Sequence, residues 1–104
     1  NNTSTETNKV SKSDIKIEVL NGTGDGNTLQ EVVDELENSG YTVSRTGNTN
    51  TTSKTTIIDK KETKQTLLDN LQQVLGTGTI SSSEVNSSSK VDVTIVIGKD
   101  YEQK

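Results

Sequence analysis

Residues 15–36, IKIEVLNGTGDGNTLQEVVDEL, run from a strand-like segment through a glycine-rich turn into a helix-like segment. At the start, Ile15, Ile17 and Val19 alternate with charged residues, which is the two-residue period of a strand with one buried face. After the glycines, four apolar residues fall at i, i+3, i+4 and i+7, and these are Leu29, Val32, Val33 and Leu36. That spacing puts them on one helical face. The stretch predicts a strand followed by an amphipathic helix over residues 28–39.

Sequence signals mark both ends of this helix. Thr28 and Glu31 have the spacing of a capping box, and Gly40 stands where a left-handed residue ends a helix. Residues 41–44 then alternate again and predict a second strand, and the polar residues 47–53 (GNTNTTS) predict a loop. A strand, a helix and a strand in succession favour a right-handed βαβ unit with two parallel strands.

The rest of the chain repeats a similar order. Residues 55–59 (TTIID) predict a third strand, and residues 63–75 predict a second amphipathic helix that Gly76 ends. We expect Ile80 to contact the core from within a short strand, and residues 91–97 (VDVTIVI) form the strongest strand pattern. We therefore expect an α+β two-layer sandwich of order β-α-β-β-α-β, with two helices on one face of a four-stranded mixed sheet. A ferredoxin-like split βαβ arrangement is the leading topology, and a small mixed sheet with another strand order is the alternative.

A length of 104 residues is enough for one domain. Residues 1–14 (NNTSTETNKVSKSD) are polar and predict a disordered linker, residues 15–101 the folded domain, and residues 102–104 a short tail. Only 25% of the residues are hydrophobic. The core must therefore be thin and aliphatic, and the domain only modestly stable.

Composition excludes several classes of function. The net charge is −4 and no basic stripe or aromatic platform is present, so we expect no nucleic-acid binding. The chain has no cysteine and no histidine, which removes disulfides, thiolates and the commonest general base and metal ligand. No serine lies in a nucleophile motif. We expect no enzyme activity, no catalytic, cofactor or metal site, and no membrane span in these residues.

The glycine turn has the position of a phosphate-binding loop but not its chemistry. The fingerprint G-x-G-x-x-G would need glycine at position 27, where this chain has Asn27. Asp25 and Glu31 also place carboxylates at the helix start, where a phosphate would need bare N–H groups. The turn is therefore interpreted as a tight structural join. Its surface stays a candidate interaction loop made of Asn21, Gly22, Thr23 and Gly24.

Two charged clusters are interpreted as solvated surface. Four carboxylates lie on the first helix, at Glu31, Asp34, Glu35 and Glu37. Three lysines lie before and within the second helix, at Lys60, Lys61 and Lys64. Acidic residues interleave with these lysines, so the local surplus of positive charge is small.

Several segments in order resemble the C-terminal domain family of LytR-type proteins. The matching segments are 19–24 (VLNGTG), 39–43 (SGYTV), 47–48 (GN), 56–58 (TII) and 91–101 (VDVTIVIGKDY). The resemblance covers about residues 14–101. It departs from the family pattern after the glycine turn, where Thr28-Leu29 replaces the usual small residue.

The resemblance implies an extracytoplasmic, envelope-associated domain of a Gram-positive-type bacterium. In that family the attached LytR-CpsA-Psr domains are understood to transfer lipid-linked anionic glycopolymers to peptidoglycan, and the catalytic arginines and aspartates belong to those domains. The implied function is a noncatalytic accessory domain that contacts peptidoglycan, a wall glycopolymer or another envelope protein. Two alternatives stay open, a nucleotide- or phosphate-binding domain that uses the glycine turn and a regulatory module that binds a small metabolite.

Overall fold

The computed structural model describes residues 11–101. Most of the predicted linker, residues 1–10, and the predicted tail, residues 102–104, lie outside the described residues. The elements in chain order are η1 (Lys12–Asp14), β1 (Lys16–Asn21), α1 (Gly26–Asn38), β2 (Thr42–Asn48), β3 (Thr56–Asp59), α2 (Gln65–Leu75), β4 (Thr79–Ser81) and β5 (Val93–Ile97). The predicted α+β class is confirmed.

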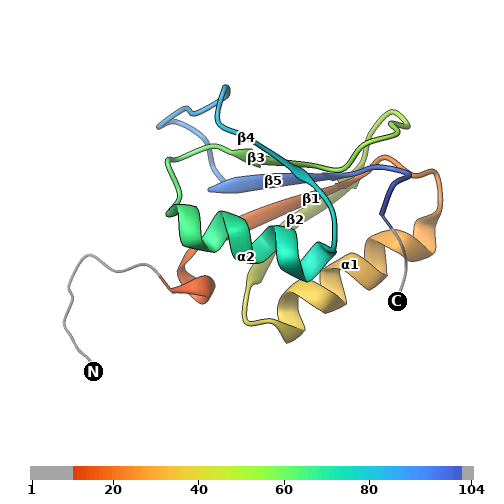
Figure 1. Ribbon diagram of the computed structural model, residues 1–104, viewed down its shortest axis with the longest axis horizontal. Helices are drawn as coiled ribbons and strands as arrows, with labels where there is room; N and C mark the ends of the chain where they lie inside the picture. The colour runs from red at the N-terminus through yellow and green to blue at the C-terminus, as the bar shows by residue number, and fades with distance from the viewer. Residues whose placement is uncertain (1–10, 102–104) are drawn as a thin grey trace.

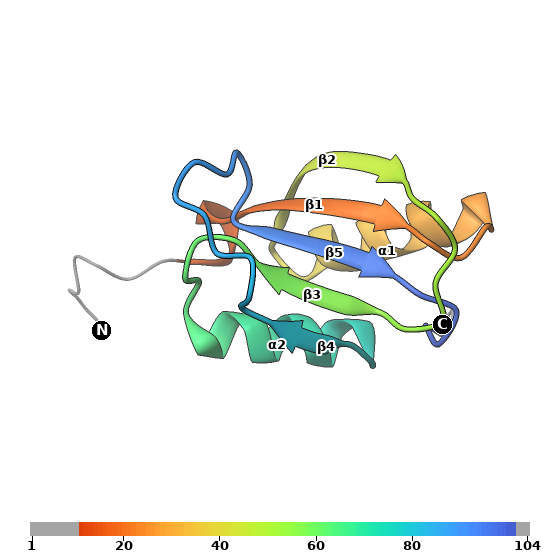
Figure 2. The same ribbon diagram turned by 90° about the horizontal axis from the view of Figure 1, so that it is seen from above.

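The five strands form one mixed sheet in the order β2-β1-β5-β3-β4 (Figure 2). β1 pairs in parallel with both β2 and β5. β3 pairs in parallel with β4 and antiparallel with β5. The sheet therefore consists of two complete βαβ units, one on each side of β5.

The predicted four-stranded, ferredoxin-like sheet is wrong in strand number and strand order. Residues 79–81 form a fifth strand on β3, a segment too short to show a strand period. The split arrangement would place the last strand at an edge, whereas β5 lies in the centre. Four of the five residues of β5 are buried, while β2 is polar and mostly exposed. A central position buries β5 on both sides and leaves the polar strand at the edge.

Both helices cover the same face of the sheet, as expected from their single apolar faces (Figure 1). Between the two layers lies one aliphatic core. Its fully buried side chains include Ile17 and Val19 of β1, Leu36 of α1, Leu71 of α2 and Ile95 of β5. The two tyrosines of the chain, Tyr41 and Tyr101, complete the core at its margins.

The helix boundaries differ from prediction at their first residues. α1 begins at Gly26 and Asp25 is its N-cap, so the predicted start at Thr28 is wrong. Because Thr28 lies within the first turn and is 4% exposed, it packs inward instead of capping. The predicted ends are confirmed, since Gly40 and Gly76 have φ angles of 100° and 78°.

β2 is longer than predicted and irregular. It continues through Asn48, into the segment expected to be a loop. Ile17 pairs with Val43 while Glu18 pairs with Arg45, so Ser44 is an extra residue that forms a bulge. The parallel pairing of β1 and β2 around α1 confirms the predicted βαβ unit.

Candidate interaction site at the glycine loop

The glycine loop, residues 21–25, lies where β1 ends, beside the segments that follow β2 and β5 (Figure 2). Backbone hydrogen bonds tie these three segments together. Thr49 N donates to Asn21 O at 3.0 Å, and Thr52 N donates to Gly22 O at 2.9 Å. Lys99 N donates in turn to Thr52 O at 2.9 Å. This end of the domain is therefore a braced structure in which each loop holds its neighbour.

Asn21 organises the loop from inside. Asn21 is buried, with only 3% of its surface exposed. Oδ1 accepts from Thr23 N at 3.0 Å and from Thr23 Oγ1 at 2.6 Å, while Nδ2 donates to Asp25 O at 2.9 Å. An amide side chain is needed here because it must accept hydrogen bonds from Thr23 and donate one to Asp25 O at the same time.

Gly22 is required by close packing. Its N–H donates to Ile97 O at 2.8 Å, and a Cβ on residue 22 would lie 2.8 Å from that same oxygen. Gly24 is required by its backbone, which has a φ angle of 83°. Unlike Gly22, Gly24 is exposed.

Asp25 occupies the N-terminus of α1 with its own carboxylate. Its Oδ1 accepts from Asn27 N at 3.0 Å, and its backbone oxygen accepts from Thr28 N at 3.1 Å. These bonds satisfy N–H groups that a phosphate would otherwise contact, and they place a negative charge beside them. The geometry is that of a self-capped helix.

The four residues of the predicted interaction loop have different environments. Asn21 and Gly22 are buried, Thr23 is half-buried, and Gly24 is exposed. Next to Gly24 lies an exposed polar segment, residues 48–51 (NTNT), which falls within the predicted loop 47–53. A Cβ built on Gly24 would lie 3.7 Å from the Thr51 methyl group, so residues 24 and 51 are neighbours in space. We call Gly24 and residues 48–51 the loop end.

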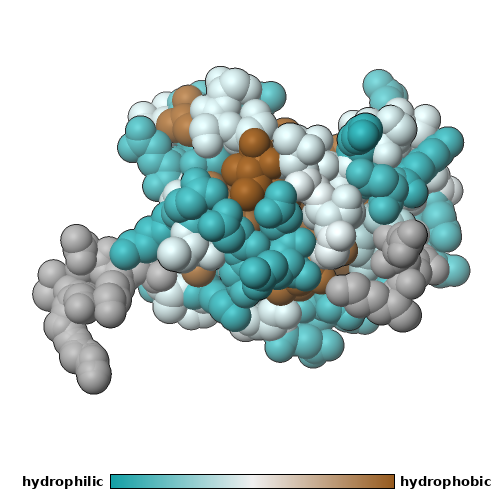
Figure 3. All heavy atoms as spheres, in the orientation of Figure 1, coloured by the Kyte–Doolittle hydropathy of each residue, from teal (hydrophilic) through white to brown (hydrophobic). Residues whose placement is uncertain are grey.

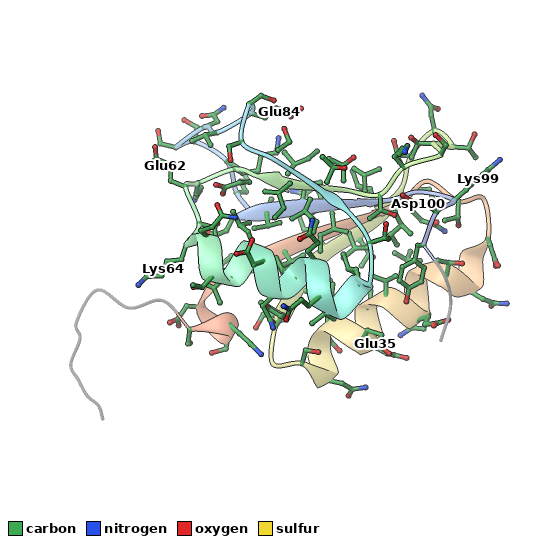
Figure 4. The ribbon with its side chains drawn as sticks, viewed as in Figure 1. Glu35, Glu62, Lys64, Glu84, Lys99 and Asp100 are labelled. Carbon is green, nitrogen blue, oxygen red and sulfur yellow. The ribbon has the colours of Figure 1, made fainter. Side chains whose placement is uncertain are left out.

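A polar cluster that joins the buried Thr55 and Gly98 to the exposed Asp100 was missed at the sequence level. Asp100 Oδ1 accepts from Thr55 N at 2.9 Å and from Thr55 Oγ1 at 2.6 Å. Thr55 Oγ1 accepts in turn from Gly98 N at 2.9 Å. Asp100 lies against this end of the sheet while Lys99 points away from the domain (Figure 4). No periodic signal marks such a cluster, because its members follow or precede strands.

The acidic cluster of α1 is partly used by the core. Glu31 and Glu35 are half-buried and face Tyr101, which is 7% exposed. Burial, and after it the charges of Glu31 and Glu35, raise the pKa of Tyr101 to about 12. On the same helix, Asp34 Oδ1 accepts from Gln30 Nε2 at 2.9 Å.

The lysine cluster lies at the other end of the domain, near Glu62 and Glu84 (Figure 4). Lys60 Nζ is 3.1 Å from Glu84 Oε1, so its charge is paired. Lys61 and Glu62 line an open depression of about 350 Å³ together with Val85 and Ser87. In the same turn the buried Asp59 accepts from Thr63 N at 2.9 Å, and Glu62 has a φ angle of 56°. Within residues 11–101, no group of three or more acidic side chains is placed to hold a metal ion.

None of the described helices is long and apolar enough to cross a membrane. A search of curated protein sequences found no match to this chain.

Two solved structures share the fold. One is described as the soluble domain (residues 71–217) of a conserved hypothetical secreted protein, an Rv2700 ortholog, from Mycobacterium marinum. It matches with a TM-score of 0.69 and 19% identity over 88% of this chain and 64% of that chain. The other is described as the C-terminal domain of RV0431, with a TM-score of 0.56 and 21% identity over 94% of this chain and 82% of that one. The chain thus spans just under two thirds of the Mycobacterium marinum domain.

A family model described as LytR cell envelope-related transcriptional attenuator matches residues 14–101, which is nearly all of the described structure. The match includes the glycine loop, both helices and all five strands. The chain belongs to the LytR C-terminal domain family.

Proposed function

We propose that the chain is a noncatalytic accessory domain that acts outside the cytoplasmic membrane and mediates contact with the cell wall or with an envelope protein for a LytR-type protein. Membership of the family over residues 14–101 carries this proposal. The Mycobacterium marinum neighbour, described as part of a secreted protein, supports the location. A Gram-positive-type envelope and a role beside wall glycopolymer attachment belong to the same proposal.

The loop end is the surface that we propose for this contact. Its backbone is braced by the hydrogen bonds of Thr49 and Thr52, so a ligand would meet a preorganised surface. Its side chains are hydroxyls and amides, which donate and accept hydrogen bonds without charge. Such groups suit peptidoglycan or another hydroxyl- and amide-rich polymer.

The polar surface of the domain favours binding through hydrogen bonds over binding through apolar side chains. The face seen in Figure 3 is mostly hydrophilic or of intermediate hydropathy, with small hydrophobic groups near its middle, at its upper left and below its middle. Among the described residues, Val85 is the large hydrophobic side chain classed as exposed, at 40%. Net charge of −4 opposes simple electrostatic adhesion to anionic wall polymers.

Retention on purified wall sacculi tests the proposal. A variant with Thr49→Ala, Asn50→Ala and Thr51→Ala removes three exposed polar side chains and keeps every backbone hydrogen bond of the loop. The matched control changes Ser82, Ser87 and Ser88 to alanine in the exposed loop at the opposite end. We expect retention of the wild-type chain and the serine control, and loss of retention for the loop-end variant.

Each outcome of this experiment is informative. No retention of the wild-type chain above an unrelated domain of similar charge would contradict wall binding. Equal retention of all three chains would move the contact away from the loop end. Repeating the assay on sacculi stripped of anionic polymer separates peptidoglycan from wall glycopolymer as the ligand.

A nucleotide- or phosphate-binding function is the alternative that the glycine loop raises. The carboxylate of Asp25 at the α1 N-terminus opposes it, because an anion would have to displace or neutralise that group. Titrating common nucleotides while following the amide resonances of Gly22 and Gly24 distinguishes the two functions. Shifts confined to these amides would support the alternative. A small-metabolite module built from paired domains would require a dimer in sedimentation.

A further inference from the structure

Asn21-Gly22 is the one Asn-Gly pair in the sequence, and such pairs are chemically reactive. The backbone nitrogen of the following residue can attack the asparagine side-chain carbonyl. A bond forms between Gly22 N and Asn21 Cγ, the Cγ–Nδ2 bond breaks, and ammonia leaves with the proton from Gly22 N. Water then opens the five-membered succinimide to give aspartate or isoaspartate at position 21. The reaction needs water and no other co-reactant.

The folded structure blocks each requirement of this reaction. The attacking nitrogen is engaged, because Gly22 N–H donates to Ile97 O at 2.8 Å. The Asn21 side chain is held by hydrogen bonds from Thr23 and to Asp25. The residue is 3% exposed, so water and hydroxide reach it poorly. Attack therefore requires the end of β1 to separate from β5.

Neither product fits the site that the amide leaves. Aspartate at position 21 places a second oxygen against Asp25 O, where Nδ2 now donates at 2.9 Å. It also places a negative charge at a buried position. Isoaspartate adds a methylene to the backbone of β1 where that strand pairs with both β2 and β5.

We infer that Asn21 is a deamidation site that folding protects, and that its modification after unfolding prevents return to the native fold. Opening of this end of the sheet exposes the most reactive asparagine of the chain. Each opened molecule then either closes again unchanged or converts irreversibly. The covalent state of residue 21 therefore records whether a molecule has unfolded.

Asn86 provides a control within the same chain. It precedes Ser87, whose side chain slows the attack relative to glycine, and it is exposed in both folded and unfolded chains. Its Oδ1 accepts from Ser88 N at 2.9 Å within its own loop. The inference therefore predicts an inversion of order. Asn86 converts before Asn21 in native buffer, and Asn21 converts before Asn86 in urea.

Peptide mass analysis of the full chain, incubated in mildly alkaline buffer with and without urea, measures both rates. We expect Asn21 to convert at least about tenfold more slowly without urea. In the folded protein, conversion is limited to the small fraction of molecules in which this end of the sheet is open. Asn86 should change little between the two conditions. Equal rates at Asn21 with and without urea would overturn the inference.

A refolding step tests irreversibility on the same wild-type material. After partial conversion the urea is removed and a brief protease treatment separates folded from unfolded chains. We expect chains converted at residue 21 to be enriched in the digested fraction, while chains converted at residue 86 distribute evenly. Converted Asn21 chains that resist protease as well as unmodified chains would contradict the second half of the inference.

Discussion

At the scale of single residues, the domain depends on a few buried polar groups beside a thin aliphatic core. Thr55 is 1% exposed and bridges two segments distant in sequence, since its hydroxyl donates to Asp100 and accepts from Gly98 N. Gly98 has no room for a side chain, because a Cβ there would lie 2.2 Å from the backbone carbon of Lys54. The C-terminal segment is thus locked onto the start of β3.

Replacing Thr55 with valine should therefore destabilise the domain. The Thr55→Val variant keeps the shape of the side chain but leaves Gly98 N–H buried without its acceptor, which costs about 1–3 kcal/mol. Urea unfolding measures the loss. Thr56→Val is the matched control, because Thr56 is half-buried on the other face, and we expect a change within about 0.5 kcal/mol. Equal losses in both variants would mean that the bridge contributes nothing specific.

Tyr101 should make the domain sensitive to alkaline pH. Its pKa is raised from 10.0 in the unfolded chain to about 12 in the folded one. The unfolded state therefore loses its proton first, and the stability from neutral Tyr101 is present below pH 10 and is lost as pH rises toward 12. Urea unfolding at a series of pH values from neutral to alkaline should show this fall.

Tyr101→Phe is the comparison for this alkaline loss, since it keeps the ring and removes the titrating group. The variant should lose less stability over the same alkaline range than the wild type. Every other side chain is the same in the two proteins, so the difference between the two curves isolates Tyr101. Parallel curves would contradict the assignment.

At the scale of elements, the two βαβ units use the same local devices. Each first strand ends in a buried Asn or Asp whose Oδ1 accepts from the N–H two residues later, at 3.0 Å for Asn21 and 3.3 Å for Asp59. Each helix is followed by a left-handed glycine, Gly40 or Gly76. The two βαβ units therefore use similar hydrogen bonds after the first strand and a similar glycine after the helix, although their loops differ in sequence.

The N-cap of α1 should have a measurable effect on its own. Asp25→Ala removes the acceptor for Asn27 N and should lower the free energy of unfolding by about 0.5–2 kcal/mol. Asp25→Asn keeps an acceptor oxygen and removes the charge, so its loss should be smaller. Urea unfolding of the three proteins checks the order. If Asp25→Asn costs as much as Asp25→Ala, the charge matters more than the hydrogen bond.

Local periodicity predicted most of the elements, because each helix and most strands bury one face. The apolar spacing of residues 29–36 and the alternation in residues 91–97 both correspond to real elements. The predicted start of α1 was wrong because Asp25 caps the helix four residues before Leu29, where the apolar period begins. The predicted strand order omits the short strand around Ile80, because only Ile80 of the three residues of β4 is apolar.

The candidate site was predicted in part. The glycine loop was correctly identified as a tight turn between β1 and α1, because its glycines carry that signal locally. Its inward-facing residues and its neighbours could not be predicted. The contacts of Asn21 and Gly22 with residues 49, 52 and 97 join segments far apart in the chain. Such contacts depend on strand order, which no local pattern contains.

At the scale of the whole molecule, stability should be uneven across the sheet. β5 is hydrogen-bonded on both sides, whereas β4 is a three-residue edge strand and β2 is an exposed edge with a bulge. We expect amide hydrogens of residues 93–97 to exchange last and those of residues 79–81 among the first, because edge strands open locally. Hydrogen exchange followed by mass spectrometry or NMR checks this order. Uniform protection across the five strands would indicate a single cooperative unit.

The central position of β5 also governs the order of events during biosynthesis. During synthesis β1 and β2 appear first as one pair, and β3 and β4 follow as a second pair. No strand joins these two pairs until residues 93–97 are made. Two-stranded sheets with one covering helix bury little, so neither half is expected to persist alone. We therefore expect the domain to fold only once residues 93–97 are available to join the two pairs.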